Sequence, residues 1–343
     1  MDIRLAHGAE TPGPVVPISV HNVITETAIV WWFLGLLLVA AGLYIAGVWR
    51  LRARGDRWAP GRTASFLLGG LGVIAYASMG GPGYYDGTVF SVHMVQHMLL
   101  MMVAPIFLAL GAPVTLALRT LPRGGRTPLL ALLHSRLAGF ATFPLVGWLF
   151  YVASPFALYF TGWYRATLGN YWLHDAMHLH FVLVGCLFFW PMLGIDPIPG
   201  RVSEPFRFLI VVSTLPFHAI LGLSIYTTDQ LVAGDYYPDL HQSWLDPLQD
   251  QRVAGGLLWS SGELIGLILL AVIGVQWMRA SEREAVREDR RLDRLEAEQA
   301  RSVRGSSVPA SEPIAVAAPA PGTGTAGAGP SPGYSDAHVG SER

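Results

Sequence analysis

The chain has 343 residues, of which 52% are apolar and only 14% are charged, and its formal net charge is −1. An ordinary globular chain carries about 25% charged residues, so this composition excludes a string of soluble domains. The single cysteine, Cys186, excludes an internal disulfide and a CxxC metal site. Several apolar runs exceed the ~18–20 residues that span a bilayer, and nothing points to nucleic acid. The sequence therefore predicts an all-α polytopic membrane protein.

Seven segments of the chain have the length and hydropathy of transmembrane helices. The predicted spans are residues 24–48, 62–80, 89–118, 137–160, 171–193, 206–226 and 253–278. All the basic residues are arginines, and most of those before residue 279 lie in the loops after the first, third and fifth spans. The positive-inside rule then predicts an outer amino terminus and a cytoplasmic carboxyl terminus. Residues 1–22 have no basic segment ahead of a short apolar core, so no cleavable signal peptide is expected.

The segments outside the seven-helix membrane domain (24–279) differ in composition. Residues 1–23 form a polar extracytoplasmic tail, and residues 227–252 form an acidic, aromatic outer loop that is either a lid or a connector. Residues 280–304 alternate acidic residues and arginines at the spacing of a solvated cytoplasmic helix. Residues 305–343 are rich in Ala, Pro, Gly and Ser and cannot build a core, so we expect disorder.

Two pairs of histidines lie within the predicted spans at a spacing of four residues. His93 and His97 belong to the third span, and His174 and His178 belong to the fifth. Residues at i and i+4 share one helical face, where two imidazoles are placed to coordinate one metal ion. Counting ~1.5 Å per residue from the outer border places both pairs in the outer half of the membrane, together with His218 of the sixth span. Ionisable residues are costly there and mark function, so we expect a metal or proton site, with a polar packing network as the alternative.

Other side chains extend this candidate site. On an ideal helix Met94 and Met101 flank the imidazole pair of the third span, whereas Met98 and Met102 point further round and are expected to pack. Imidazole and thioether ligands together suit Cu(I) better than Zn(II).

Two carboxylates and one further histidine have other expected roles. Asp175, at the outer border of the fifth span, is expected either to orient a histidine or to cap the helix. Glu263 is the only carboxylate near the middle of a span, which makes it a candidate ligand, proton relay or imidazole partner. His180 lies about 120° from the face of the other two histidines of its span, so we interpret it as a separate polar contact.

Four separate motifs resemble those of the CtaG family of cytochrome c oxidase assembly factors, named for the caa3-type oxidase. They are residues 93–100 (HMVQHMLL) with 104–105 (AP) and 110–113 (LGAP), residues 174–178 (HDAMH) with 190–191 (WP) and 194–197 (GIDP), residues 216–219 (PFHA), and residues 250–259 (DQRVAGGLLW) with 262–264 (GEL). The resemblance covers residues 25–285. It implies maturation of a haem-copper oxidase in the bacterial plasma membrane, by binding or delivering copper for the CuB centre. Oxidase subunits and an extracytoplasmic copper donor are the implied partners.

Other functions compete with a non-catalytic copper-binding assembly factor. Seven-span zinc hydrolases also gather histidines and acids near one face, and here Glu263 or Asp175 would serve as base to a metal-bound water. The methionines and the absence of a placed serine count against this reading. A metal-free scaffold that docks oxidase subunits is a further alternative. Two haems stacked across a bilayer would need histidines about 14 residues, ~20 Å, apart on each helix, which a spacing of four does not provide.

Overall fold

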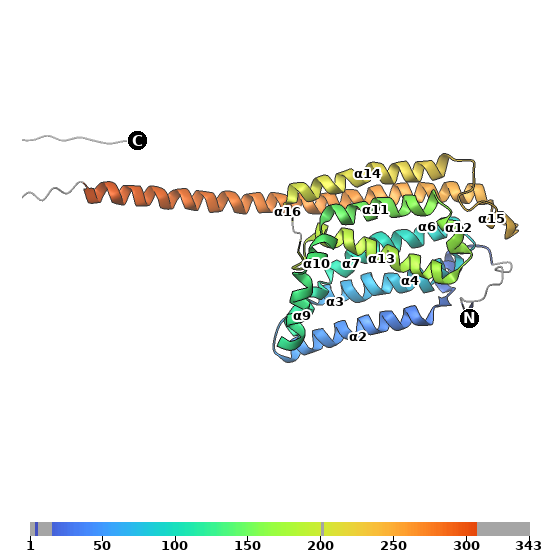
Figure 1. The fold of residues 1–343 in the computed structure, drawn as a ribbon, viewed down its shortest axis with the longest axis horizontal. Helices are drawn as coiled ribbons and strands as arrows, with labels where there is room; N and C mark the ends of the chain where they lie inside the picture. The colour runs from blue at the N-terminus through green and yellow to red at the C-terminus, as the bar shows by residue number, and fades with distance from the viewer. Residues whose placement is uncertain (1–3, 6–15, 200–201, 307–343) are drawn as a thin grey trace, which may run out of the picture. The chain divides into compact units, whose positions relative to one another are not determined.

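The computed structural model describes residues 4–5, 16–199 and 202–306, and most of these are helical, which confirms the all-α prediction. The two-residue strands β1 (Arg4–Leu5) and β2 (Ala28–Ile29) form one parallel pair. The chain divides into two units, Met1–Glu284 and Ala285–Arg343. The first unit is a helical bundle (Figure 1).

Six helical segments among the described residues are long and apolar enough to cross a membrane, so the chain is a multi-pass membrane protein. These segments are Trp31–Ala53, Pro60–Tyr85, Phe90–Thr120, Tyr171–Leu193, Glu204–Thr227 and Pro247–Arg301. The fourth predicted span is shorter, because helix α10 (Arg136–Ala141) ends before Pro144 begins α11 (Pro144–Tyr159). Sixteen helical residues extend ~24 Å, less than the ~30 Å hydrocarbon core of a bilayer. The count of seven spans and their orientation stay predictions.

Two of the six segments are interrupted by π-helical turns. The second consists of α3 (Pro60–Ala64), η1 (Ser65–Gly72), α4 (Val73–Met79) and α5 (Gly81–Tyr85). The third consists of α6 (Phe90–Met98), η2 (Leu99–Val103), α7 (Ala104–Leu110) and α8 (Pro113–Thr120). Proline has no N–H to donate to the carbonyl four residues earlier, so Pro105 leaves the carbonyl of Met101 outside the regular α-helical ladder. The π-helical turn η2 lies just before this proline.

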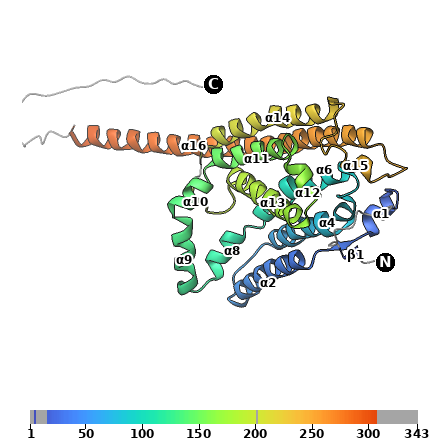
Figure 2. The same cartoon turned by 45° about the vertical axis from the view of Figure 1, so that its right-hand side comes forward.

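Helix α13 (Tyr171–Leu193) occupies the middle of the bundle, where it packs against α7 and α11, and it lies beside α11 in both Figures 1 and 2. It also packs against η2 and against α12 (Trp163–Leu168). The approach to η2 requires Gly185, since a Cβ at this position would lie 2.1 Å from the Met101 carbonyl oxygen. Small residues allow such close backbone contact between membrane helices. Gly185 therefore sets the separation between α13 and the third span.

Asp196 fastens the segment after α13 to the amino-terminal end of α8. Its carboxylate accepts hydrogen bonds from the backbone N–H groups of Val114 and Thr115, at 3.2 and 2.8 Å, and from the Trp190 indole at 3.0 Å. A carboxylate that satisfies the free N–H groups of a helix amino terminus stabilises the helix. Asp196 and Trp190, which belong to one of the sequence motifs, therefore have a structural role.

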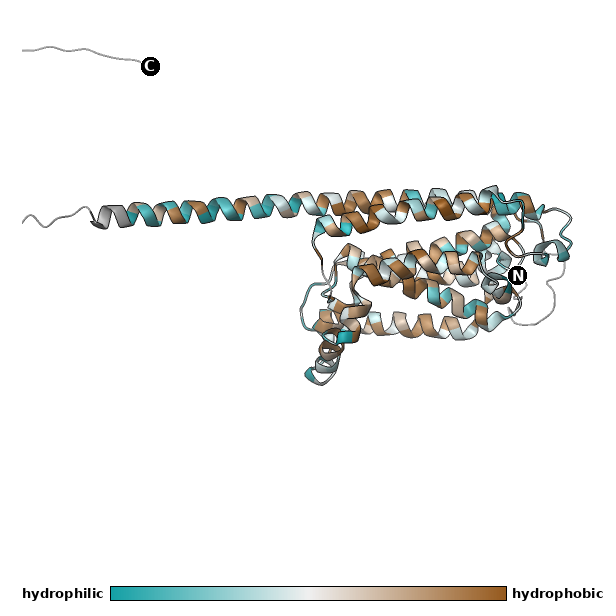
Figure 3. Cartoon of the chain, turned by 45° about the horizontal axis from the view of Figure 1, so that its top comes forward, coloured by the Kyte–Doolittle hydropathy of each residue, from teal (hydrophilic) through white to brown (hydrophobic). Residues whose placement is uncertain are grey.

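The remaining helices complete the bundle and the connecting segments. They are α1 (Val20–Thr25), α2 (Trp31–Ala53), α9 (Arg123–Leu133), α14 (Glu204–Thr227), α15 (Tyr236–Asp239) and α16 (Pro247–Ser306). Figure 3 shows apolar residues along the membrane-crossing helices and hydrophilic residues in the later part of α16. Residues 285–301 of α16 are exposed and rich in charge, as expected for residues 280–304. The predicted tail at 305–343 lies outside the described residues from position 307 onward, as does most of residues 1–15.

Candidate metal centre

Four of the five predicted histidines converge between α6 and α13. The ring centroids of His93 and His97 are 4.0 Å apart, and those of His174 and His178 are 4.4 Å apart. Across the two helices, His93 lies 5.3 Å from His174, and His97 lies 6.2 Å from His178. A metal–nitrogen bond of about 2.0–2.1 Å would place the ring centroids of two tetrahedral ligands roughly 5 Å apart. The four separations bracket this value, but among the described residues only Asp86, His174 and His178 bring one potential ligand atom each within 4.8 Å of the others.

The buried histidines leave ring nitrogens without partners. His93 is 0% exposed, His97 2% and His178 4%, whereas the side chain of His174 is 16% exposed. Within the part of the chain that the structure describes, His93 Nδ1 and Nε2, His97 Nε2 and His174 Nε2 are buried and make no hydrogen bond shorter than 3.5 Å. Asp86 is a polar neighbour of two of these rings, through its backbone at His93 and its carboxylate at His174. Each buried polar group without a partner costs about 1–3 kcal/mol. Four such atoms in one cluster are what a binding site for a ligand would have.

Tyr159 of α11 holds the ring of His97. The Tyr159 hydroxyl lies 2.6 Å from His97 Nδ1 and donates to the sulfur of Met94 at 3.6 Å. A hydroxyl can donate or accept, so this contact is compatible with either neutral tautomer of His97. In both cases Nδ1 is engaged by Tyr159, and Nε2 is the His97 nitrogen without a hydrogen bond.

Asp86 adds a carboxylate that sequence reasoning missed. Its Oδ2 lies 3.9 Å from His174 Nε2 and accepts a hydrogen bond from the Gln96 side chain at 2.9 Å. Asp86, His174 and His178 each place one potential ligand atom within 4.8 Å of the other two. Burial raises the pKa of Asp86 above its ordinary value, opposed by the nearby His174 imidazole and by the hydrogen bond from Gln96. The sequence feature that could have identified Asp86 is its position: it lies in the turn before the third span, at the same border as both histidine pairs.

The family described as cytochrome c oxidase caa3 assembly factor (Caa3_CtaG) matches residues 42–280. The chain belongs to this family. The resemblance seen in the motifs is thereby confirmed, and all four converging histidines and Asp86 of this Caa3_CtaG protein lie within the matched residues.

Longer mycobacterial proteins are similar to this Caa3_CtaG chain. Uncharacterized proteins of Mycobacterium bovis and Mycobacterium tuberculosis are each 38% identical to it over 299 residues, which cover 83% of this chain and 44% of theirs. An uncharacterized protein of Mycobacterium leprae is 36% identical over 276 residues, which cover 77% of this chain and 42% of its own length. The chain therefore spans less than half the length of these curated relatives. No solved structure matches it.

His218, the fifth predicted histidine of this Caa3_CtaG protein, has a different environment. Its Nδ1 donates to the Thr214 carbonyl at 3.2 Å, and its ring lies 5.2 Å from that of Tyr151 and against Gly262. None of the contacts described for it joins it to the other four histidines. The reason lies in helix packing, since α14 packs against α11, whereas the other four histidines belong to α6 and α13.

The predicted accessory residues of the Caa3_CtaG site also have defined surroundings. The sulfur of Met94 is engaged by Tyr159, and Met101 is buried within η2, where the angles of an ideal α-helix no longer apply. Asp175 accepts a hydrogen bond from the Trp32 indole at 2.9 Å, which ties α13 to α2. Glu263 is half-buried on α16. Met98 and Met102 are both buried in the apolar core, as expected for packing residues.

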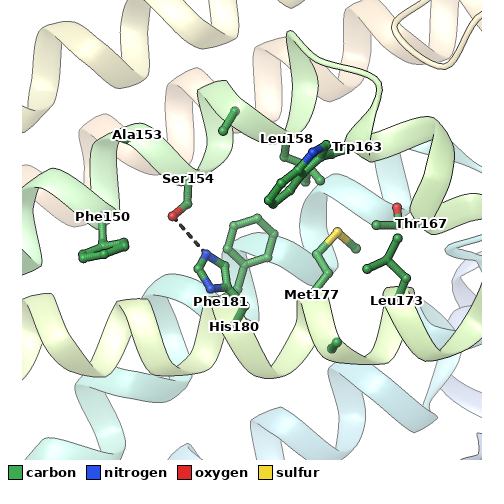
Figure 4. Close-up of a pocket in the computed structure, with 12 residues that line it drawn as sticks. Phe150, Ala153, Ser154, Leu158, Trp163, Thr167, Leu173, Met177, His180 and Phe181 are labelled. Atoms are coloured by element: carbon green, nitrogen blue, oxygen red, sulfur yellow. Dashed lines mark hydrogen bonds between the residues drawn. The ribbon is translucent and has the colours of Figure 1, made fainter.

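His180 makes the separate polar contact that its helical position predicted. Its Nε2 lies 3.0 Å from the Ser154 hydroxyl, inside a mainly apolar cavity of about 450 Å³ between α11, α12 and α13 (Figure 4). Phe181 separates this cavity from the histidine cluster, with its ring 4.5 Å from that of His97. His180 is therefore a matched control for the four converging histidines, since it lies on the same helix as two of them but outside the cluster.

Proposed function

We propose that this caa3 oxidase assembly factor binds copper through His93, His97, His174 and His178 and holds it for the CuB centre of its client oxidase. The observation that carries the proposal is the convergence of four imidazoles with four buried, unpartnered ring nitrogens. Membership in an oxidase assembly family supports copper as the ion, with zinc as the competing ion. Met94 lies in the same hydrogen-bonded network, and its thioether favours Cu(I) as the form held.

We also propose the orientation in which this site faces the outside of the cell. The distribution of arginines supports it, with the amino terminus outside, α11 counted as a seventh crossing and the carboxyl terminus in the cytoplasm. Copper then reaches the cluster from an extracytoplasmic donor and passes to an oxidase subunit in the same membrane.

One observation supports a second candidate, a zinc-dependent hydrolase. Two histidines and one carboxylate with an open position are a common catalytic zinc set, and His174, His178 and Asp86 supply these donor types. In this alternative the carboxylate of the zinc site is Asp86, and neither Glu263 nor Asp175 belongs to the site. The third alternative, a docking scaffold without metal, leaves the unpartnered ring nitrogens without an explanation.

Metal analysis of the purified protein tests these proposals. The experiment compares the wild type, the double variant His93→Ala/His97→Ala and the control His180→Ala after Cu(I) loading under reducing conditions. We expect bound copper in the wild type and the control and its loss in the double variant. Equal copper in all three would refute the site, and zinc binding with amide hydrolysis would favour the hydrolase. A wild type that binds neither ion would favour the remaining alternative, a docking scaffold without metal.

A further inference from the structure

We infer that Gln96 and Asp86 form a positioning chain that determines which ring nitrogen of His178 is offered to a metal ion. The inference rests on the proposed function for the identity of the ligand, but the hydrogen bonds that carry it exist without metal. Gln96 is fully buried on α6, between the two histidines of that helix. It was not among the predicted site residues.

The orientation of the Gln96 side-chain amide is fixed by its two acceptors. Its Nε2 donates to the Ala77 carbonyl at 3.0 Å and to Asp86 Oδ2 at 2.9 Å. Rotating the amide by 180° would turn its oxygen towards both of these oxygens, and a backbone carbonyl never donates. The amide nitrogen therefore faces Ala77 and Asp86, and Oε1 faces the opposite direction.

Gln96 Oε1 in turn defines the tautomer of His178. It lies 3.0 Å from His178 Nε2, and because an amide oxygen only accepts, this nitrogen carries the hydrogen. In the neutral imidazole the lone pair then belongs to Nδ1. Outer hydrogen bonds of this kind fix the tautomer and ring orientation of metal-binding histidines.

His97 and His178 face each other across the two helices, and each leaves a different ring nitrogen free. Tyr159 occupies Nδ1 of His97 and leaves Nε2, whereas Gln96 occupies Nε2 of His178 and leaves Nδ1. Nδ1 is nearer to the backbone than Nε2, so an ion bound by His178 lies closer to α13 than the spacing of the histidines alone would suggest. Gln96 is fully buried, so bulk solvent does not reach its carbonyl oxygen.

The tautomer is measurable in the metal-free protein by nitrogen NMR after labelling of the histidines. Two variants test the acceptor: Gln96→Met loses both the donors to Ala77 and Asp86 and the acceptor for His178, whereas Gln96→Glu keeps an acceptor for His178 and, when protonated, one O–H donor. We expect the Nε2–H tautomer of His178 in the wild type and in Gln96→Glu, and a mixture of tautomers in Gln96→Met. An unchanged His180 spectrum confirms that each variant is folded. A wild-type His178 with its hydrogen on Nδ1 would overturn the inference.

Copper affinity provides the second readout. Loss of such outer hydrogen bonds lowers metal affinity by about 10–100-fold, so we expect this decrease in Gln96→Met relative to wild type and a smaller one in Gln96→Glu. Equal affinities in both variants and the wild type would refute the positioning role even if copper binds. If the expected tautomers are found in a protein that binds no copper, the positioning chain is upheld and the proposed function is refuted. The two failures are therefore distinguishable.

Discussion

Replacing Gly185 with alanine tests whether the approach of α13 to the third span builds the site. The added Cβ would lie 2.1 Å from the Met101 carbonyl oxygen and 2.6 Å from Pro105 Cγ, whereas ordinary contact begins at 3.4 Å. The difference, 3.4 − 2.1 = 1.3 Å, is the local shift that the oxygen contact requires if no other atom gives way. Overpacking of this kind typically costs about 1–3 kcal/mol.

The same shift acts on the histidines, because His174 and His178 belong to α13 and their partners belong to α6. Widening the cross-helix separations of 5.3 and 6.2 Å moves the ligands away from the positions that one ion requires. Metal–ligand distances tolerate deviations of only about 0.2 Å, so we expect Gly185→Ala to weaken copper binding together with thermal stability.

A competition titration with a Cu(I) chelator and thermal unfolding in the same detergent measure the two effects. Gly42→Ala in α2 is the matched control, since a Cβ there meets nothing within 4 Å and alanine is the better helix former. We expect the control to match or exceed the wild type in stability and to bind copper equally. A Gly185→Ala protein with wild-type stability and affinity would refute the reasoning.

Three further substitutions have separate expected outcomes. The raised pKa of Asp86 means that its contribution to stability is fully present below about pH 4 and is lost as pH rises through the folded-state pKa. His174 and Asp175 lie close enough to Asp86 to influence this titration, in opposite senses. Asp86→Asn should therefore raise the Tm of the metal-free protein near pH 8 but not near pH 4, and a gain independent of pH would contradict this. Tyr159→Phe keeps the ring but removes the partner of His97 Nδ1, so copper affinity should fall about 10–100-fold, and a chelator titration that shows no change would exclude this role. Asp196→Ala should cost about 1–3 kcal/mol in denaturant unfolding while leaving copper affinity unchanged, since its described hydrogen bonds are to the start of α8 and to Trp190 rather than to the histidines.

The position of a residue along its helix was predictable from sequence, but its neighbours were not. Helical rise fixes how far His93, His97, His174 and His178 lie from the ends of their helices, and the two pairs do meet. His218 was expected at a similar depth yet contacts Tyr151 and Thr214. Which helices lie side by side depends on packing details such as the glycine at position 185, and no periodicity in one span encodes its neighbour.

Local departures from ideal helices account for the other differences. The angular position expected for Met101 assumed 3.6 residues per turn, whereas the π-helical turn from Leu99 to Val103 changes the spacing just after His97. Pro105 was visible in the sequence, but its effect on the preceding turn was not. Asp86 was missed for a different reason, because it lies in a turn, where no repeat pattern identifies a ligand.

The difference in exposure within the cluster explains why loss of His93 and His97 distinguishes copper binding from zinc-dependent hydrolysis. Asp86 and His174 are partly exposed, so an ion entering the cluster meets a carboxylate and one imidazole first, while His93 and His97 are almost fully buried. A hydrolase needs a metal that water and substrate reach, and Asp86, His174 and His178 already supply three ligands for it. The inner pair is superfluous for that chemistry. A protein that holds copper gains from every additional imidazole that excludes water, so loss of His93 and His97 should abolish copper retention but would leave a zinc site on the other three residues.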